Sequence, residues 1–219
     1  MRPYRNPLSG PSDLRGWVAE GPVGVEHRDG GMILTSTADE AALIAQGRGD
    51  HAHFTFWCPE VFGADIEISW DFRPLAGRGL AMLFFAATGT GGRDLFDPSL
   101  AERTGHYPQY HSGDVSVLHV SYLRRKWPTE RRFHTCNLRK SPGFRLVAQG
   151  ADPLPDPEDA EGHYRIRVTK RGGAVSFAID DLDLFTFRDD DPLGGGRIGF
   201  RQMAPLAAHY RNLEVTPLP

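Results

Sequence analysis

The chain has 219 residues, of which 40% are hydrophobic and 24% charged, a composition that excludes disordered and fibrous proteins. Its formal net charge of −3 is too small to indicate nucleic acid or a membrane surface as a partner. The longest apolar run, LAMLFFAA at residues 80–87, is far too short to span a bilayer.

The N-terminal segment, residues 1–16, carries charges and prolines but lacks the apolar stretch of a secretion signal. Cys58 and Cys136 are too few for a disulfide framework, and each lies among β-forming neighbours, where a free cysteine usually acts as a small buried hydrophobe. We therefore expect a cytoplasmic protein in which residues 1–16 form an extended lead-in.

Short runs of β-forming residues recur from VGVEH, GMILTST and HFTFWC through to GRIGFRQM and HYRNLEV, separated by Gly, Pro, Asp and Asn. About a dozen such runs predict a single all-β domain over residues 1–219, a two-sheet antiparallel β-sandwich of the jelly-roll type. The sequence KRGGAV at 170–175 predicts a hairpin turn. Helical turns are expected only within 38–47 and 97–105.

Alternation within these runs predicts which side chains leave the core. In ADIEISWDF the apolar residues share one face, and Glu67 and Asp71 lie on the other. FHTCNLRK and GRIGFRQM alternate in the same way, which puts Asn137, Arg139 and Arg201 on polar faces. A packed core under a polar, concave sheet is the arrangement we expect.

Reactive side chains are densest in GHYPQYHSGDVSVLHVSYLRRK, which holds three histidines, three tyrosines and three cations. YHSGD places Tyr110, His111 and Asp114 in a loop before a strand, where scaffolds usually carry reactive groups. On the strand that follows, His119 and Tyr122 fall on opposite faces, so one of the two points into the core or its margin.

Four segments in order, LAMLFFAATGTGGRDLFD, YHSGDVSVLHVSYLRR, NLRKSPGFRLVAQGAD and GRIGFRQM…HYRNLEV, resemble the YesU-like family of the concanavalin A-like lectin/glucanase superfamily. The resemblance runs from about Trp17 to Val215. It implies a two-sheet jelly roll and a role in plant or microbial polysaccharide breakdown, in this family's case rhamnogalacturonan use.

The sequence departs from the superfamily in one motif. Its retaining glucanases use two carboxylates at Glu-x-Asp-x-Glu spacing on one strand, as nucleophile and as acid/base. The nearest pattern here is Glu67-Ile-Ser69-Trp-Asp71, with serine in place of the middle aspartate. Hydrolysis by this pair stays open beside the alternative that the two carboxylates lie on a solvated strand face.

The remaining polar residues match what β-elimination on a uronic acid sugar requires. Arginine neutralises the sugar carboxylate and so acidifies the neighbouring C–H, while histidine or tyrosine transfers protons. We assign catalytic roles to His111, His119, Tyr122 and Arg139. The residues expected to bind substrate are Tyr110, Asp114, Arg125, Trp127, Asn137, Arg201, Gln202, Glu67 and Asp71. The alternative for Arg139 and Arg201 is pairing with Glu67 or Asp71 on neighbouring strands.

The sequence thus predicts a carbohydrate-active enzyme that cleaves a glycosidic bond in pectin-type or rhamnogalacturonan-type oligosaccharides containing uronates, as a lyase ahead of a hydrolase. The alternative is a non-catalytic oligosaccharide-binding module. We expect no cofactor and no metal, because His51 and His53 lack a third ligand and the acidic loop at 152–161 has no recognised calcium spacing. The expected partner is an oligosaccharide, and a homodimer is left open.

Overall fold

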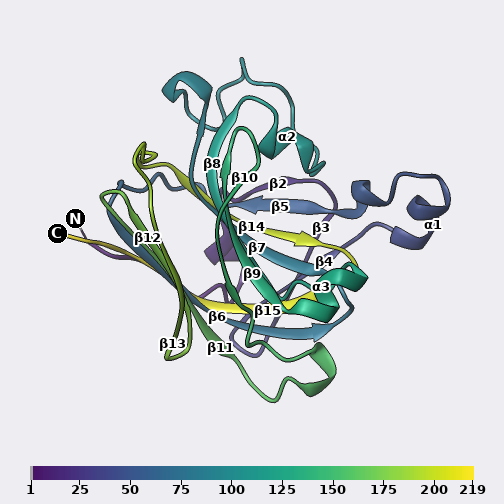
Figure 1. Cartoon of the computed structure of the whole chain (residues 1–219). Helices are drawn as coiled ribbons and strands as arrows, with labels where there is room; N and C mark the ends of the chain where they lie inside the picture. Colours follow the sequence, from purple (N-terminus) through teal and green to yellow (C-terminus); the bar gives the residue numbers. More distant parts are fainter. Residues whose placement is uncertain (1) are drawn as a thin grey trace.

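The computed structural model describes residues 2–219 and consists of two antiparallel β-sheets packed face to face (Figure 1). Sheet A contains β1 (Tyr4–Asn6), β3 (Val23–Arg28), β4 (Gly31–Ser36), β6 (Ile66–Ala76), β11 (Tyr164–Arg171), β12 (Ala174–Ile179), β13 (Leu182–Arg188) and β15 (Ala207–Pro217). Sheet B contains β2 (Val18–Glu20), β5 (Phe54–Trp57), β7 (Leu80–Gly89), β8 (Val115–Tyr122), β9 (Thr135–Ser141), β10 (Arg145–Ala151) and β14 (Arg197–Met203). The predicted all-β, two-sheet sandwich is confirmed.

The strand order in sheet A is β13-β12-β11-β6-β15-β4-β3, with β1 paired to β15, and in sheet B it is β10-β9-β8-β7-β14-β5-β2. Strands distant in sequence are therefore neighbours: β7 lies between β8 and β14. The expected hairpin at 170–175 is confirmed, because β11 and β12 are joined through Gly172 and Gly173, and Gly172 adopts the positive φ that such a turn requires.

Helices are short and lie in the connections: α1 (Glu40–Ala45), α2 (Pro108–His111), α3 (Pro128–Phe133), and the 3-10 turns η1 (Pro11–Leu14), η2 (Gly49–Ala52), η3 (Thr90–Gly92) and η4 (Pro157–Asp159). The expected helical turn within 38–47 is α1, whose N-cap Asp39 accepts a hydrogen bond from the Ala42 N–H. Within 97–105 the chain forms a single turn, in which the Leu100 N–H donates to the Asp97 carbonyl (3.0 Å), and not a helix. A proline opens both α2 and α3, which were not expected.

The N-terminal lead-in is part of the sandwich, because Tyr4–Asn6 pair with Leu213–Val215 of β15. Met1 lies outside the described residues. Among residues 2–219, the helices are all too short or too polar to cross a bilayer.

The core fills the space between the sheets with large aromatic side chains. Phe72 of β6 contacts Tyr122 of β8 with ring centroids 5.0 Å apart, and Trp70 contacts Phe200 of β14 at 5.6 Å. All four side chains are almost completely buried, and each such side chain contributes roughly 1.5–3 kcal/mol to folding. Because strand residues alternate, the positions between them point away from the core, to the outer face of each sheet.

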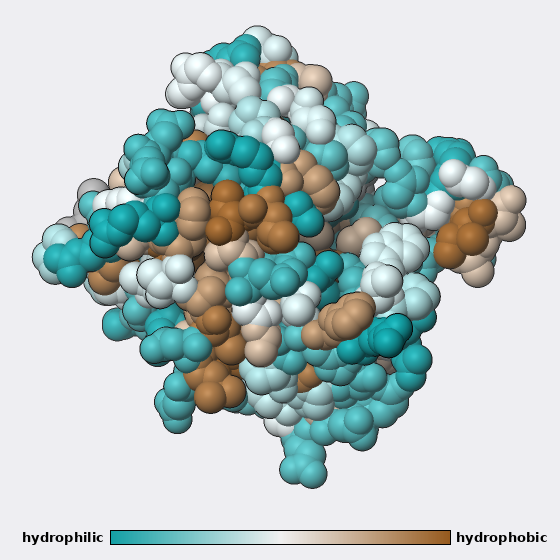
Figure 2. Space-filling model, viewed as in Figure 1, coloured by the Kyte–Doolittle hydropathy of each residue, from teal (hydrophilic) through white to brown (hydrophobic). Residues whose placement is uncertain are grey.

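The outer face of sheet B is itself covered. A second apolar cluster lies on it, in which Trp57, Phe84 and Val117 of the strands pack against Leu95 and Tyr110 from the segment that connects β7 to β8. The connection between β4 and β5, which carries α1, projects from the body at the right of Figures 1 and 2. Sheet B is therefore roofed by loops that leave a hollow beneath them.

Candidate functional site

Two adjoining cavities, of about 350 and 600 Å³, lie on the outer face of sheet B. Both are lined by Tyr107, Trp127 and Met203, so they form the two chambers of one continuous space, which we call the sheet B cleft. The inner chamber lies over β7, β8 and β9, and the outer chamber lies under the loop that carries α1.

One wall of the inner chamber is cationic. Arg139, on β9, donates from Nη1 to the Phe144 carbonyl (2.9 Å), and its guanidinium lies 4.0 Å from the centroid of the Phe144 ring. Its Nε and Nη2 atoms make no hydrogen bond to other residues in the described part of the chain, so they are available to a ligand. Burial lowers the pKa of Arg139, which nevertheless stays charged at neutral pH.

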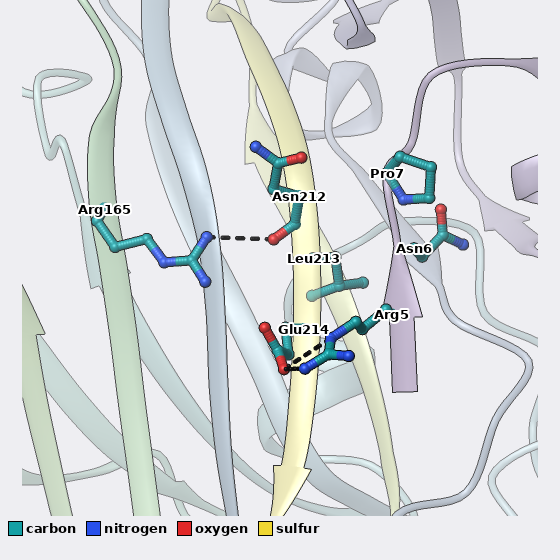
Figure 3. A pocket seen from close by; sticks show the side chains of 7 residues that line it. All are labelled: Arg5, Asn6, Pro7, Arg165, Asn212, Leu213 and Glu214. Atoms are coloured by element: carbon teal, nitrogen blue, oxygen red, sulfur yellow. Dashed lines mark hydrogen bonds and ion pairs between the residues drawn. The ribbon is translucent and has the colours of Figure 1, made fainter. Parts of the chain in front are cut away.

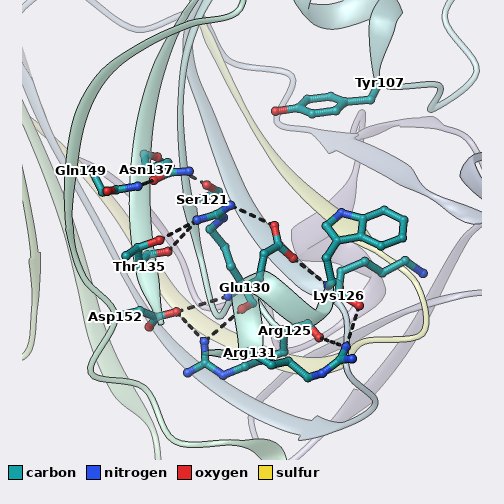
Figure 4. A network of polar contacts seen from close by, with 12 residues as sticks. Tyr107, Ser121, Arg125, Lys126, Glu130, Arg131, Thr135, Asn137, Gln149 and Asp152 are labelled. Atoms are coloured by element: carbon teal, nitrogen blue, oxygen red, sulfur yellow. Dashed lines mark hydrogen bonds and ion pairs between the residues drawn. The ribbon is translucent and has the colours of Figure 1, made fainter. Parts of the chain in front are cut away.

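Arg124 completes this wall and is held in place by a polar network, of which Figure 4 labels Glu130, Thr135 and Asn137. It donates to the Thr135 hydroxyl (2.7 Å) and to the Glu130 carboxylate (3.0 Å). The Asn137 amide lies 3.0 Å from the Arg124 guanidinium and 2.8 Å from the Gln149 amide. These contacts fix the Arg124 and Asn137 side chains before any ligand binds.

Beside the cations lies a phenol paired with an imidazole, since His119 on β8 is the cross-strand neighbour of Arg139 on β9. The Tyr107 hydroxyl and His119 Nε2 are 2.8 Å apart, and His119 is completely buried. Burial lowers the pKa of His119 to about 3, so its ring is neutral near pH 7. Burial also raises the pKa of Tyr107 to about 12, so the phenol keeps its proton.

His111, on α2, lies beside this pair at the mouth of the outer chamber. Its ring centroid is 4.8 Å from that of Tyr107 and 4.3 Å from that of Phe144. Its Nδ1 contacts the Ser112 hydroxyl (2.7 Å), which leaves Nε2 without a partner among residues 2–219. Burial lowers its pKa, and His111 is therefore neutral and able to accept a proton near pH 7.

Four predicted site residues do line the cleft: Arg139, Asn137, His111 and Trp127, the last with 52% of its surface exposed. His119 lies directly beneath Tyr107 rather than at the surface. Arg201 is also covered, by the rings of Tyr107 and Tyr110, and does not reach the cleft.

Three further residues of the predicted site do not reach the cleft: Tyr122, Gln202 and Arg125. Tyr122 is buried between the sheets and cannot transfer a proton to a substrate. Gln202 faces the same core, where its amide contacts the Tyr210 hydroxyl at 2.9 Å.

Arg125 is wrong as a substrate contact because it is completely buried. It forms ion pairs with Asp152 (2.9 Å) and Asp156 (2.7 Å). The strict alternation assumed for this strand stops at Leu123, whose φ of 46° turns the chain. Arg124 rather than Arg125 consequently faces the cleft.

Tyr110 and Asp114 stabilise the roof instead of binding a ligand. The Tyr110 hydroxyl donates to Glu20 (2.7 Å) beneath the surface, and the Asp114 carboxylate accepts from the Ala101 N–H (2.8 Å). Both contacts fix the segment that carries Tyr107.

Glu67 and Asp71 lie on the outer face of sheet A, on the other side of the core from the cleft. Asp71 pairs with Arg165 (3.0 Å) and Arg211 (3.2 Å), and although burial opposes it, hydrogen bonds from Asn212 and Arg165 lower its pKa. The alternative in which Arg139 or Arg201 pairs with these carboxylates is therefore wrong, and neither carboxylate can act in the cleft.

The two histidines weighed as metal ligands do not share a strand face. His51 lies in η2 and His53 follows it, outside β5. Within the described residues, no group of three or more His, Cys, Asp or Glu side chains is placed to hold a metal ion.

A further cavity, of about 250 Å³, lies on sheet A beside β15 (Figure 3). Its two arginines are already engaged: Arg5 pairs with Glu214 at 3.0 Å, and Arg165 donates to the Asn212 carbonyl at 3.2 Å. It offers a ligand neither an unpaired charge nor an aromatic platform.

The cleft residues that the sequence did not single out include Tyr107, Arg124, Ser121 and Phe144. Tyr107 belongs to the stretch richest in histidine and tyrosine, and Ser121 shares a strand face with His119. These two signals point to the right region, whereas Phe144 reaches the cleft only through the turn between β9 and β10.

Fold and cleft together define a galectin-like or concanavalin A-like β-sandwich with a polar cleft on one sheet. The chain belongs to the family described as a domain of unknown function (DUF1961), whose model matches residues 2–215. It is 51% identical over 217 residues to the uncharacterized protein YesU of Bacillus subtilis (strain 168), covering 97% of this chain and 94% of YesU. The resemblance to the YesU-like family is thereby confirmed.

Solved structures support the same fold. A crystal structure from Bacillus subtilis, described as a protein of unknown function with a galectin-like fold, matches with a TM-score of 0.91 and 50% identity, over 98% of this chain and 94% of that one. The Bacillus licheniformis β-glucanase matches with a TM-score of 0.62 and 12% identity, over 99% and 98% of the two chains. This second likeness shows the fold alone.

Proposed function

We propose that this chain acts on oligosaccharides that contain a uronic acid, of the pectic or rhamnogalacturonan type, and cleaves the glycosidic bond by β-elimination. The observation that carries the proposal is that one cleft brings together the cationic wall, the protonated phenol of Tyr107 and the neutral imidazole of His111. The galectin-like and glucanase-like architecture supports a sugar as the ligand.

The cationic wall suits a sugar carboxylate. Arg139 has free N–H groups and Arg124 stands beside it, so a planar carboxylate can be held by two parallel hydrogen bonds. Neutralising this carboxylate acidifies the C5–H bond of the uronate, because the negative charge that develops on proton removal is spread onto the carboxyl group.

The phenol and imidazole supply the proton transfers. His111 Nε2 takes the proton from C5, and the C–H electron pair forms the C4–C5 double bond as the C4–O bond breaks. The leaving oxygen takes the proton of the Tyr107 hydroxyl. The imidazolium and phenolate that remain exchange a proton through water, which restores both groups. Two groups whose pKa values are pushed apart can serve as base and acid at the same pH.

Hydrolysis by a carboxylate pair has less support. The cleft is lined by three carboxylates, and each is already engaged: Glu40 and Glu130 form ion pairs with Lys126 and Arg124, and Asp50 contacts the His106 imidazole. A nucleophilic carboxylate and a protonated acid at the two sides of a glycosidic bond need different surroundings from these.

A binding module without turnover is the second candidate. Trp127 favours it, since this half-exposed indole lies where the two chambers meet and offers a flat apolar surface to a sugar ring. The same Arg139 would then hold the carboxylate, and no proton would be transferred.

Product analysis separates these candidates. The purified protein is incubated in heavy-oxygen water with pectic and other uronate oligosaccharides, and the products are examined by mass spectrometry. Elimination yields one unlabelled fragment with an unsaturated end and conserves the total mass. A heavy oxygen atom in the new end would mean hydrolysis and would overturn the proposed chemistry. Substrates that bind and emerge intact would identify a binding module.

A further inference from the structure

Arg201, on β14, is a completely buried cation with incomplete pairing. Its Nη1 donates to the Gly105 carbonyl (2.8 Å) and to the Thr55 hydroxyl (3.2 Å). Its Nε and Nη2 find no acceptor in the described part of the chain, and neither of its two hydrogen bonds goes to a carboxylate. A buried charge with so few partners is costly, so the fold retains it against a substantial desolvation penalty.

Two phenol rings cover this guanidinium, with centroids 4.8 Å (Tyr107) and 5.1 Å (Tyr110) from its central carbon. The Tyr110 hydroxyl is engaged by Glu20, and Tyr110 does not line the cleft. Tyr107 lines both chambers, and its hydroxyl contacts His119. Tyr107 is therefore the ring that connects Arg201 to the cleft.

We propose that Arg201 is a positioning residue that holds the Tyr107 ring against His119 and stabilises the phenolate formed when Tyr107 gives up its proton. The inference deepens the proposed elimination and rests on it for its catalytic meaning. A guanidinium beside a neutral ring gains a modest cation–π attraction, and it gains much more when the ring carries a negative charge in a dry site. The Arg201 guanidinium, which has no carboxylate partner in the resting protein, is thus paired with the Tyr107 phenolate during the proton transfer.

The charges around Tyr107 support this assignment. Burial raises the pKa of Tyr107, whereas Arg201, Arg139 and Arg124 lower it and Glu130 raises it. The two imidazoles that face the ring, His111 and His119, are neutral near pH 7. Of the three cations, Arg201 lowers the pKa of Tyr107 most strongly, and it alone is completely buried.

The test measures the acidity of the phenol without any substrate. Site-specific 3,5-difluorotyrosine at position 107 has a more acidic phenol, which brings ionisation to a pH at which the protein is folded, and fluorine NMR follows its titration. The variants are Arg201→Met and Arg201→Gln, which remove the charge, and Arg201→Lys, which keeps it. Arg197→Met on the same strand is the matched control, because Arg197 pairs with Asp94 away from Tyr107. Two neutral variants are used so that one that fails to fold does not end the test.

The neutral variants are expected to raise the midpoint of the titration by about one pH unit or more, a tenfold loss of acidity. Arg201→Lys is expected to restore most of it, and Arg197→Met to leave it unchanged. A folded neutral variant with an unshifted midpoint, or an equal shift in Arg197→Met, would overturn the role of Arg201. If the midpoint shifts as expected but uronate oligosaccharides are not cleaved, the proposed elimination fails while the Arg201–Tyr107 coupling stands.

Discussion

The two outer faces of the sandwich are built from the same kind of alternating strand, yet they differ in how their charged side chains are paired. On sheet A, Asp71 pairs with both Arg165 and Arg211 at the protein surface. On sheet B, Arg139 has free donors, and Arg201 is buried without a carboxylate. The difference comes from the loop between β7 and β8, which shields sheet B from solvent and so strengthens the attraction between Arg139 and an anion in the cleft.

Tyr107→Phe is expected to have the largest effect on turnover. Removal of a general acid costs about 10²–10⁴-fold in kcat, and the ring and its packing are kept. The matched change on sheet A, Asp71→Asn, is expected to leave kcat unchanged. The kcat of each variant is measured from the ultraviolet absorbance of the unsaturated product as it forms. Loss of turnover in Asp71→Asn alone would move the active site to sheet A.

Glu20→Gln is expected to have the largest effect on stability. The Glu20 carboxylate accepts from Trp57 Nε1 (2.8 Å) and Tyr110 (2.7 Å) and pairs with Arg103, all in buried surroundings. Breaking a buried pair leaves an unpaired charge and costs about 3–5 kcal/mol. Glu214→Gln removes the surface partner of Arg5 and should cost less than about 1 kcal/mol. Urea unfolding measures the free energy of unfolding of both variants. Equal decreases in the two variants would contradict the contrast between the two faces.

The stability of the protein should fall as the pH decreases from 6.5 towards 3, in part because of His119. Its folded pKa of about 3 lies below the ordinary value of 6.5, so between these values the unfolded chain binds a proton that the folded chain excludes. The His119→Gln variant keeps a polar partner for Tyr107 and should reduce the slope of unfolding free energy against pH by up to about 1.4 kcal/mol per pH unit. An unchanged slope would show that His119 is protonated in the folded protein.

Trp127→Ala is expected to weaken oligosaccharide binding by about tenfold, or about 1.4 kcal/mol, by removing the apolar platform between the chambers. The indole is 52% exposed, so stability should change by less than about 0.5 kcal/mol. Phe133→Ala is the control, because Phe133 is 64% exposed at the C-terminal end of α3, the helix that Trp127 precedes, and does not line the cleft. Calorimetric titration of both variants decides, and an equal loss in Phe133→Ala would argue against a specific platform.

The sequence predicts those parts of the site that local alternation controls. Asn137 and Arg139 were placed correctly on a polar face, because two residues per repeat determine the faces of a regular strand. The prediction fails for Arg125, since alternation ends at the left-handed Leu123. It also misses Tyr107, whose position depends on contacts such as that between Tyr110 and Glu20, 90 residues apart. Glu67 and Asp71 show the same limit, because nothing local tells which sheet a strand joins.

We propose that the sheet B cleft recognises the carboxylate of a uronic acid. We would titrate the Tyr107→Phe variant, which is expected to leave the substrate uncleaved, by calorimetry. The two ligands are a uronate oligosaccharide and its methyl ester. The acid should bind at least about tenfold more tightly, and adding Arg139→Met should abolish this preference, whereas adding Arg165→Met on sheet A should preserve it. Equal binding of acid and ester, or a preference lost with Arg165→Met and kept with Arg139→Met, would contradict the account.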